Sequence, residues 1–98
     1  MLAFNAKEVA ERLDYPSLVD ALDEGFRSEI TVPLRHHHVL PAAGKRDATM
    51  LLMLAWYSNF IGLKTVILEP GNGLKNLPSV QANYQLMNRK TGQLVAYM

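Results

Sequence analysis

The sequence predicts an α+β domain in which two N-terminal helices pack on an antiparallel or mixed sheet of about five strands. Apolar residues recur at helical spacing up to about residue 30, and the pattern changes to that of extended chain from residue 31. Clusters of Gly, Pro and Asn then divide the remaining sequence into short apolar runs. With 98 residues, 49% of them hydrophobic, the chain can form one small globular domain.

Both predicted helices begin with recognisable start signals. Asn5 followed by Glu8 resembles a capping box and predicts a short helix to about Leu13. Pro16 suits the first turn of a second helix, which we expect to fade near residues 28–30. The apolar side of this second helix carries Leu18, Val19, Leu22 and Phe26. We expect both helices to lie with their apolar sides on the sheet.

The rest of the chain predicts strands separated by turns. Residues 31–40 are extended, and Pro33 places this segment near a strand start or a sheet edge. Residues 48–57 are apolar at nearly every position, which indicates a strand covered on both faces. Because so small a domain has few elements with which to cover both, we expect one face to meet a second subunit. Further strands are predicted at residues 60–68, 80–87 and 93–98.

Two turn segments complete this description. Residues 69–79 form a long loop rich in Gly, Pro and Asn, which is either a lid over a site or a simple crossover. Residues 88–92 are predicted to form a hairpin turn, in which Gly92 can adopt a positive φ.

The composition argues against several classes of function. Ten basic and nine acidic residues give a formal charge of +1 without a basic stripe, so nucleic acid is not an expected partner. The absence of cysteine excludes disulfides and thiolate metal sites. The first residues are too polar for a signal peptide, and the longest apolar run is too short to span a membrane. We therefore expect a soluble, cytoplasmic protein without a membrane partner.

Lys64 stands in the middle of the otherwise apolar strand predicted at residues 60–68. Because an isolated ammonium group is costly to bury, a lysine at such a position normally has an anionic partner. The strand leads directly into the loop of residues 69–79, and a fixed cation beside a loop suits the binding of a carboxylate or phosphate. Three interpretations are open: a bound ligand, a structural ion pair with an Asp or Glu, and a side chain that reaches solvent at a sheet edge.

Three consecutive histidines, His36, His37 and His38, raise the question of a metal site. In a strand His36 and His38 share a face, but a metal site needs a third ligand with converging geometry. No Asp or Glu lies in the same strand, and no second histidine cluster exists. We therefore predict no metal site, and we expect His37 to share a face with Arg35.

Several short motifs, taken in order, resemble the ornithine cyclodeaminase/mu-crystallin family. The motifs are Val32-Pro-Leu-Arg35, Gly62-Leu-Lys-Thr-Val66, Pro70-Gly-Asn72, Leu77-Pro-Ser-Val-Gln-Ala82 and Thr91-Gly-Gln-Leu-Val-Ala96. Met53 stands where the family often has a Met-Pro pair, and here Leu54 replaces the proline. Each motif alone is weak, but their order and spacing cover essentially the whole chain.

The resemblance implies that residues 1–98 are the N-terminal substrate-binding and dimerisation domain of an NAD(P)-dependent enzyme and form a homodimer. The Rossmann domain would then be absent, and the apolar segment of residues 93–98, inside which the chain stops, also suggests a truncation at Met98. No Gly-x-Gly-x-x-Gly motif occurs, so no residue of this fragment is expected to bind NAD or NADP. We expect no catalytic residue in the fragment, which alone would be inactive.

By the same resemblance, Arg35 and Lys64 correspond to residues that bind the substrate carboxylate. A guanidinium can bind a carboxylate bidentately while an ammonium supplies a point charge. The full-length parent would act as an ornithine cyclodeaminase-like enzyme, of the amino-acid dehydrogenase or ketimine reductase type, at the α-carbon of an amino or imino acid. Ornithine-specific members have an acidic residue where this chain has Leu51, which argues against ornithine. The alternatives are a non-catalytic, mu-crystallin-like binding protein and a pure dimerisation module.

Overall fold

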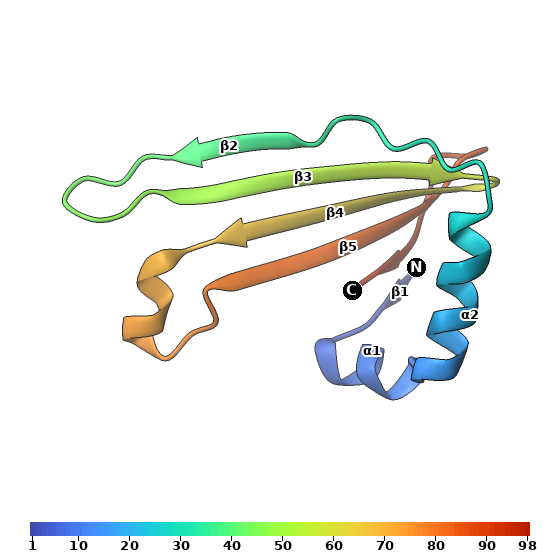
Figure 1. Cartoon of the computed structure of the whole chain (residues 1–98), viewed down its shortest axis with the longest axis horizontal. Coiled ribbons are helices and arrows are strands. Elements are labelled where there is room, and N and C mark those ends of the chain that lie inside the picture. The colour runs from blue at the N-terminus through green and yellow to red at the C-terminus, as the bar shows by residue number, and fades with distance from the viewer.

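A six-stranded mixed sheet forms the body of the computed structural model, which describes residues 1–98 (Figure 1). The strands are β1 (Leu2–Ala3), β2 (His36–Leu40), β3 (Ala48–Tyr57), β4 (Phe60–Leu68), β5 (Val80–Asn88) and β6 (Leu94–Tyr97). Their order across the sheet is β1-β6-β5-β4-β3-β2, and every pair is antiparallel except β1 with β6. The predicted α+β class is confirmed, with six strands where about five were expected. The additional strand, β1, is two residues long and therefore too short to show a periodic pattern.

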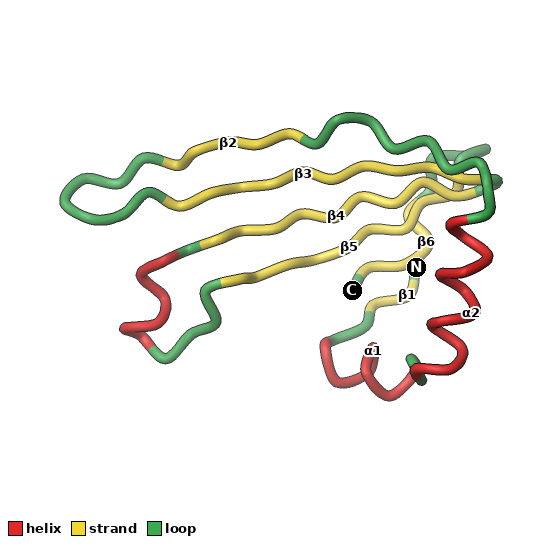
Figure 2. Tube along the Cα trace, in the orientation of Figure 1, coloured by secondary structure: helices red, strands yellow, loops and turns green.

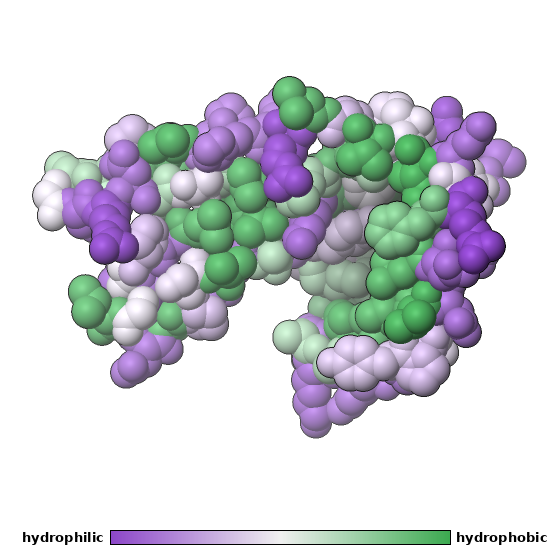
Figure 3. Space-filling view, viewed as in Figure 1, coloured by the Kyte–Doolittle hydropathy of each residue, from purple (hydrophilic) through white to green (hydrophobic).

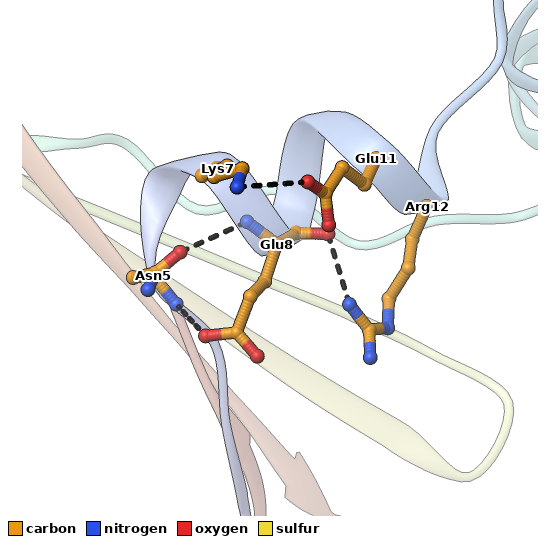
Figure 4. A network of polar contacts seen from close by, with 5 residues as sticks. All are labelled: Asn5, Lys7, Glu8, Glu11 and Arg12. Atoms are coloured by element: carbon orange, nitrogen blue, oxygen red, sulfur yellow. Dashed lines mark hydrogen bonds and ion pairs between the residues drawn. The ribbon is translucent and has the colours of Figure 1, made fainter.

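The two N-terminal helices, α1 (Ala6–Arg12) and α2 (Tyr15–Phe26), begin at the predicted signals. The Asn5 side chain accepts a hydrogen bond of 2.9 Å from the Glu8 backbone N–H, and the Glu8 carboxylate accepts one of 3.2 Å from the Asn5 N–H (Figure 4). This reciprocal pair is the expected capping box. Asp14 caps α2 by accepting a hydrogen bond from the Ser17 backbone N–H at 2.8 Å, which lowers the pKa of Asp14. Neither helix, nor any other in the structure, is long and apolar enough to cross a membrane.

The segment predicted as a long loop contains a short 3-10 helix, η1 (Pro70–Lys75). The Glu69 side chain caps it by accepting a hydrogen bond of 3.1 Å from the Gly71 N–H, and Asn76 ends it in a left-handed conformation. The sequence therefore carries start and stop signals here, but over too few residues for a helical period to be visible. The predicted turn at residues 88–92 is present, with Gly92 at φ 74°.

The register of the central strands sorts their side chains onto two faces of the sheet. Lys64 lies opposite Met53 of β3 and opposite Tyr84 of β5, so these three side chains share one face, which we call the lysine face. We call the other side the apolar face, defined by Met50, Leu52, Leu54, Trp56, Ile61, Leu63 and Ile67. β3 therefore presents apolar side chains on both faces, but the chain alone leaves most of them only half-buried, so the predicted cover of both faces stays a prediction.

The helices cover less of the sheet than the sequence suggests. Figure 2 shows the strands side by side, with η1 and the loop of residues 41–47 at one end and α1 and α2 at the other. All extensive contacts between elements join neighbouring strands, and neither α1 nor α2 lies flat on the sheet. On α2, Val19 is 61% exposed, Leu22 51% and Phe26 89%. Figure 3 shows apolar surface over α2 and the neighbouring strands on this side of the molecule.

The chain exposes far more surface than a compact protein of its size. Its accessible surface is 7747 Å², whereas a compact monomer of 11.0 kDa exposes about 5,600 Å². Its radius of gyration is 16.0 Å, against about 12.6 Å for a compact domain of this length. Only Ala48, Gly62, Val66 and Ala96 are buried. Both faces of the sheet are therefore left open by the chain itself.

The buried Gly62 provides a test of how the lysine face is packed. A Cβ atom at this position would overlap the Tyr84 hydroxyl oxygen and lie 2.7 Å from Tyr84 Cζ. We predict that Gly62→Ala lowers the free energy of unfolding by about 1–3 kcal/mol, because the ring must be displaced. Urea unfolding of Gly62→Ala, Tyr84→Ala and the double variant measures the coupling, and the double variant should lose less than the sum of the two single variants. Additive losses would contradict the packing described here.

Candidate functional site

Lys64 projects from the centre of the sheet, and its backbone is held by pairing on both sides. β4 is hydrogen-bonded to β3 along one edge and to β5 along the other. The lysine is exposed, so its ammonium group does not carry the burial cost that the apolar strand suggested. β4 is an interior strand, which excludes the interpretation of a lysine at a sheet edge. What remains is a well-positioned cation on an apolar surface.

The chain provides no carboxylate for this cation. Lys64 is the only Lys, Arg, Asp or Glu residue in the six strands. The two ion pairs of the structure, Lys7–Glu11 and Arg27–Asp23, lie within α1 and at the end of α2. An ion pair between Lys64 and an acidic residue of the chain is therefore not formed, and an anion that neutralises Lys64 must come from outside residues 1–98.

Arg35 lies immediately before β2, next to His36, which pairs with Leu52 of β3. The regular register ends at His36, and the next bridge, Thr31 with Trp56, is shifted by one residue, so Arg35 has no fixed partner in the sheet. Two strand spacings separate the backbones of Arg35 and Lys64 by about 10 Å, within reach of two long side chains that converge on one small anion. Arg35 is exposed and forms no ion pair or side-chain hydrogen bond within the chain. The structure thus brings the two predicted residues to the same part of the sheet but not into contact.

The neighbouring residues on the lysine face are apolar apart from one histidine. Leu51 pairs with His37 on one side and with Val66 on the other, which places all three on the lysine face. His36 and His38 lie on the opposite, apolar face, as the strand period predicts, with ring centroids 6.0 Å apart. No group of three or more His, Cys, Asp or Glu side chains is close enough to hold a metal ion.

Towards α2, the lysine face continues into a pocket of about 240 Å³. Tyr84 and Gly62 contribute to its lining from the sheet, and Ile30 contributes from the segment that follows α2. The sequence did not point to Tyr84, because its position opposite Lys64 depends on the register between two strands joined by an eleven-residue connection. The only available signal was Gly62 two residues before Lys64, since a glycine inside a strand often marks the close approach of another group.

A larger hollow, of about 380 Å³, lies at the other end of the sheet and is lined by Lys45, Arg46 and η1. The nearby carboxylates are already engaged, since Glu69 caps η1 and Asp47 accepts a hydrogen bond from the Ala42 N–H. Its two basic residues are exposed loop side chains without a fixed strand beneath them. The lysine face is therefore the stronger candidate site.

Comparison with known proteins places this fold among enzymes that act on amino and imino acids. No protein-family model matches the chain. An uncharacterised protein of Schizosaccharomyces pombe is 28% identical over 88 residues, which cover 86% of this chain and 27% of that protein.

Three solved structures described here match the chain over its whole length. An archaeal alanine dehydrogenase dimer with bound NAD is 27% identical with a TM-score of 0.83, and this chain covers 30% of it. The Δ1-pyrroline-2-carboxylate reductase of Thermococcus litoralis, in complex with NADH and L-proline, is 26% identical with a TM-score of 0.82, and the chain covers 31% of it. A lysine cyclodeaminase that recognises L-lysine, L-ornithine and L-2,4-diaminobutyric acid shares the fold at 21% identity and a TM-score of 0.80, with 32% covered.

These structures fit the ornithine cyclodeaminase/mu-crystallin superfamily that the sequence resembles. The chain spans less than a third of the length of each of these four proteins.

The absence of an internal partner for Lys64 leads to a prediction about stability. Replacing Lys64 by Met removes no ion pair, so the free energy of unfolding should stay within about 0.5 kcal/mol of the wild-type value or rise. Thermal and urea unfolding of Lys64→Met measure this change, with Lys45→Met as the exposed-loop control. A loss well above that of the control would show that Lys64 has a structural role in the sheet.

Proposed function

We propose that residues 1–98 form the substrate-binding and dimerisation domain of an ornithine cyclodeaminase-like, NAD(P)-dependent enzyme that acts at the α-carbon of an amino or imino acid. The observation that carries this proposal is Lys64, a cation without a counter-ion on a sheet free of acidic residues. The chain matches, over its whole length, an alanine dehydrogenase with bound NAD and a Δ1-pyrroline-2-carboxylate reductase with bound NADH and L-proline. This match supports a reaction that depends on a nicotinamide cofactor.

In this proposal Lys64 and Arg35 bind the substrate carboxylate together. The two backbones are about 10 Å apart, so two extended side chains can approach a carboxylate from opposite sides. The guanidinium supplies two parallel hydrogen bonds and the ammonium a point charge. Fixing the carboxylate also fixes the α-carbon, and such orientation lowers the barrier of a reaction at that atom.

The nicotinamide cofactor, NAD or NADP, would be held outside this domain. The chain has no Gly-x-Gly-x-x-Gly segment, and its only parallel strand pair, β1 with β6, joins the two ends of the sequence and so lacks a short crossover helix. The cofactor supplies hydride chemistry when bound. The residues described here would bind and orient the substrate, and residues 1–98 alone would be inactive.

The surroundings of Lys64 favour an apolar substrate. Leu51 lies on the lysine face, diagonally across from Lys64, and cannot accept a hydrogen bond from a distal amine. Met53 and Val66 are equally unable to do so. The substrate that fits best is therefore an apolar amino acid, a keto acid or a cyclic imino acid rather than ornithine.

The apolar face supports a homodimer. The chain exposes about 2,000 Å² more than a compact monomer of its mass, and obligate dimers typically bury about 1,000–2,500 Å² on each subunit. β2 is an edge strand with one unpaired side, which allows a second copy to approach the sheet from that edge. A second copy on the apolar face would remove Leu54 and its neighbours from water, while a second domain would cover the lysine face.

The first test concerns carboxylate binding in the full-length protein. Lys64→Ala and Arg35→Ala should each raise the KM for the amino or keto acid about 10- to 150-fold, which corresponds to the loss of a charged hydrogen bond. The affinity for NAD(P) should not change, and Lys45→Ala serves as the control. An unchanged KM in Lys64→Ala would show that the carboxylate lies elsewhere. Tight binding without turnover in the wild type would instead identify a non-catalytic binding protein.

The second test concerns assembly. Leu54 is 37% exposed on the apolar face, so Leu54→Glu should leave the fold intact but place a charge in the proposed interface. Sedimentation velocity should show a wild-type dimer and a Leu54→Glu monomer, whereas Leu74→Glu, at the 95% exposed Leu74 of η1, should remain dimeric. A wild-type monomer at high concentration, or a dimeric Leu54→Glu variant, would exclude this interface.

A further inference from the structure

Two of the three consecutive histidines lie beside residues that define the apolar face. His36 is opposite Leu52 and His38 is opposite Met50 in the register of β2 with β3. Cross-strand neighbours of this kind have Cβ atoms about 4.5–5.5 Å apart. Every residue of β2 is exposed in the chain itself, and the two histidine rings lie 6.0 Å apart between centroids. A partner that covers the apolar face as far as β3 therefore also meets these two histidines.

The apolar face contains no acidic group that could balance a charge on the two histidines. The positions level with them on the next strands are Thr65 and Ile67 of β4, followed by Asn83 and Gln81 of β5. Across the sheet, the one other titratable side chain on this face is Tyr97 of β6, and a phenol is neutral below about pH 8. A second copy would bring the same acid-free surface.

The segments that flank β2 do not supply the missing negative charge either. Their acidic residues are Glu29, which follows α2, and Asp47, which already accepts a hydrogen bond from a backbone N–H. Neither forms an ion pair, because the two ion pairs of the structure lie in α1 and at the end of α2. The basic residues nearby, Arg35 before β2 and Lys45 and Arg46 after it, add positive charge instead.

We propose that His36 and His38 make the association of two copies through the apolar face dependent on pH. This inference rests on the proposed homodimer. Imidazole is the side chain that ordinarily gains a proton and a charge between about pH 8 and pH 5. In a separated copy a charged imidazole stays hydrated, whereas in an apolar, acid-free interface its charge is uncompensated. Protons therefore bind preferentially to the separated copies, and the dimer weakens as the pH falls below about 6.5.

The test measures the dimer dissociation constant of the full-length protein by fluorescence-detected sedimentation at about pH 8 and about pH 5.5, with EDTA present to exclude bound metal. The wild-type Kd should rise at least about 100-fold at the lower pH, since each histidine that must stay neutral contributes about tenfold. The double variant His36→Gln/His38→Gln should reduce this change to less than about threefold. His37→Gln is the matched control on the lysine face and should keep the wild-type response.

The outcomes separate the histidines from the dimer itself. An equal wild-type Kd at both pH values, or a response that persists in His36→Gln/His38→Gln, would overturn the role of the histidines and leave the homodimer standing. Loss of the response in His37→Gln would also overturn it. A wild-type monomer at about pH 8 would instead exclude the homodimer on which the inference rests.

A permanent charge provides a test that needs no acid, and it decides the matter if far-UV circular dichroism shows unfolding at the lower pH. His38 is exposed on an edge strand, where lysine is well tolerated. His38→Lys should raise the Kd at least about tenfold at about pH 8, whereas His37→Lys on the opposite face should not. An unchanged Kd in His38→Lys would overturn the proposal.

Discussion

The antiparallel pairing of β4 with both β3 and β5 is the constraint on which the candidate site depends. It fixes Lys64 in one row with Met53 and Tyr84, and it places this cation on a sheet whose strands contain no Asp or Glu. An ammonium without a fixed counter-ion can attract an anionic ligand without first breaking an internal ion pair. The same register brings the Tyr84 side chain over Gly62, where it fills the space that a Cβ atom would occupy. The position of the lysine and the packing of Tyr84 beside it therefore both follow from this strand pairing.

The two faces of the sheet are proposed to have different functions. The lysine face combines one cation with an apolar pocket, whereas the apolar face offers aliphatic and aromatic side chains without charge. With only four buried residues, the isolated chain hides little apolar surface, and folded domains have only a narrow margin of stability. Packing of one face against a second copy and of the other against a further domain would bury the apolar surface that the isolated chain leaves exposed. Folding, assembly and substrate binding are then expected to be coupled.

Much of the fold could be predicted from local pattern, and part of the site could not. The strands at residues 48–57 and 60–68 were predicted at their observed bounds, because long apolar runs end there at polar turn residues. β1 and η1 were missed because two and six residues cannot establish a period. Lys64 was identifiable from its apolar neighbours alone. Tyr84 was not, because its place depends on the register between two strands joined by eleven residues. The open position of α2 could not be predicted either, since an apolar helix face indicates that it is suited to burial but not what covers it.

Carboxylate binding by Lys64 can be tested directly with a crystal structure of the full-length protein with NAD(P) and a bound α-keto acid. We expect a carboxylate oxygen about 3 Å from Lys64 Nζ, with the Arg35 guanidinium on the other side of the same carboxylate. A structure in which Lys64 instead pairs with an Asp or Glu of another domain or subunit, while the ligand carboxylate lies elsewhere, would contradict it.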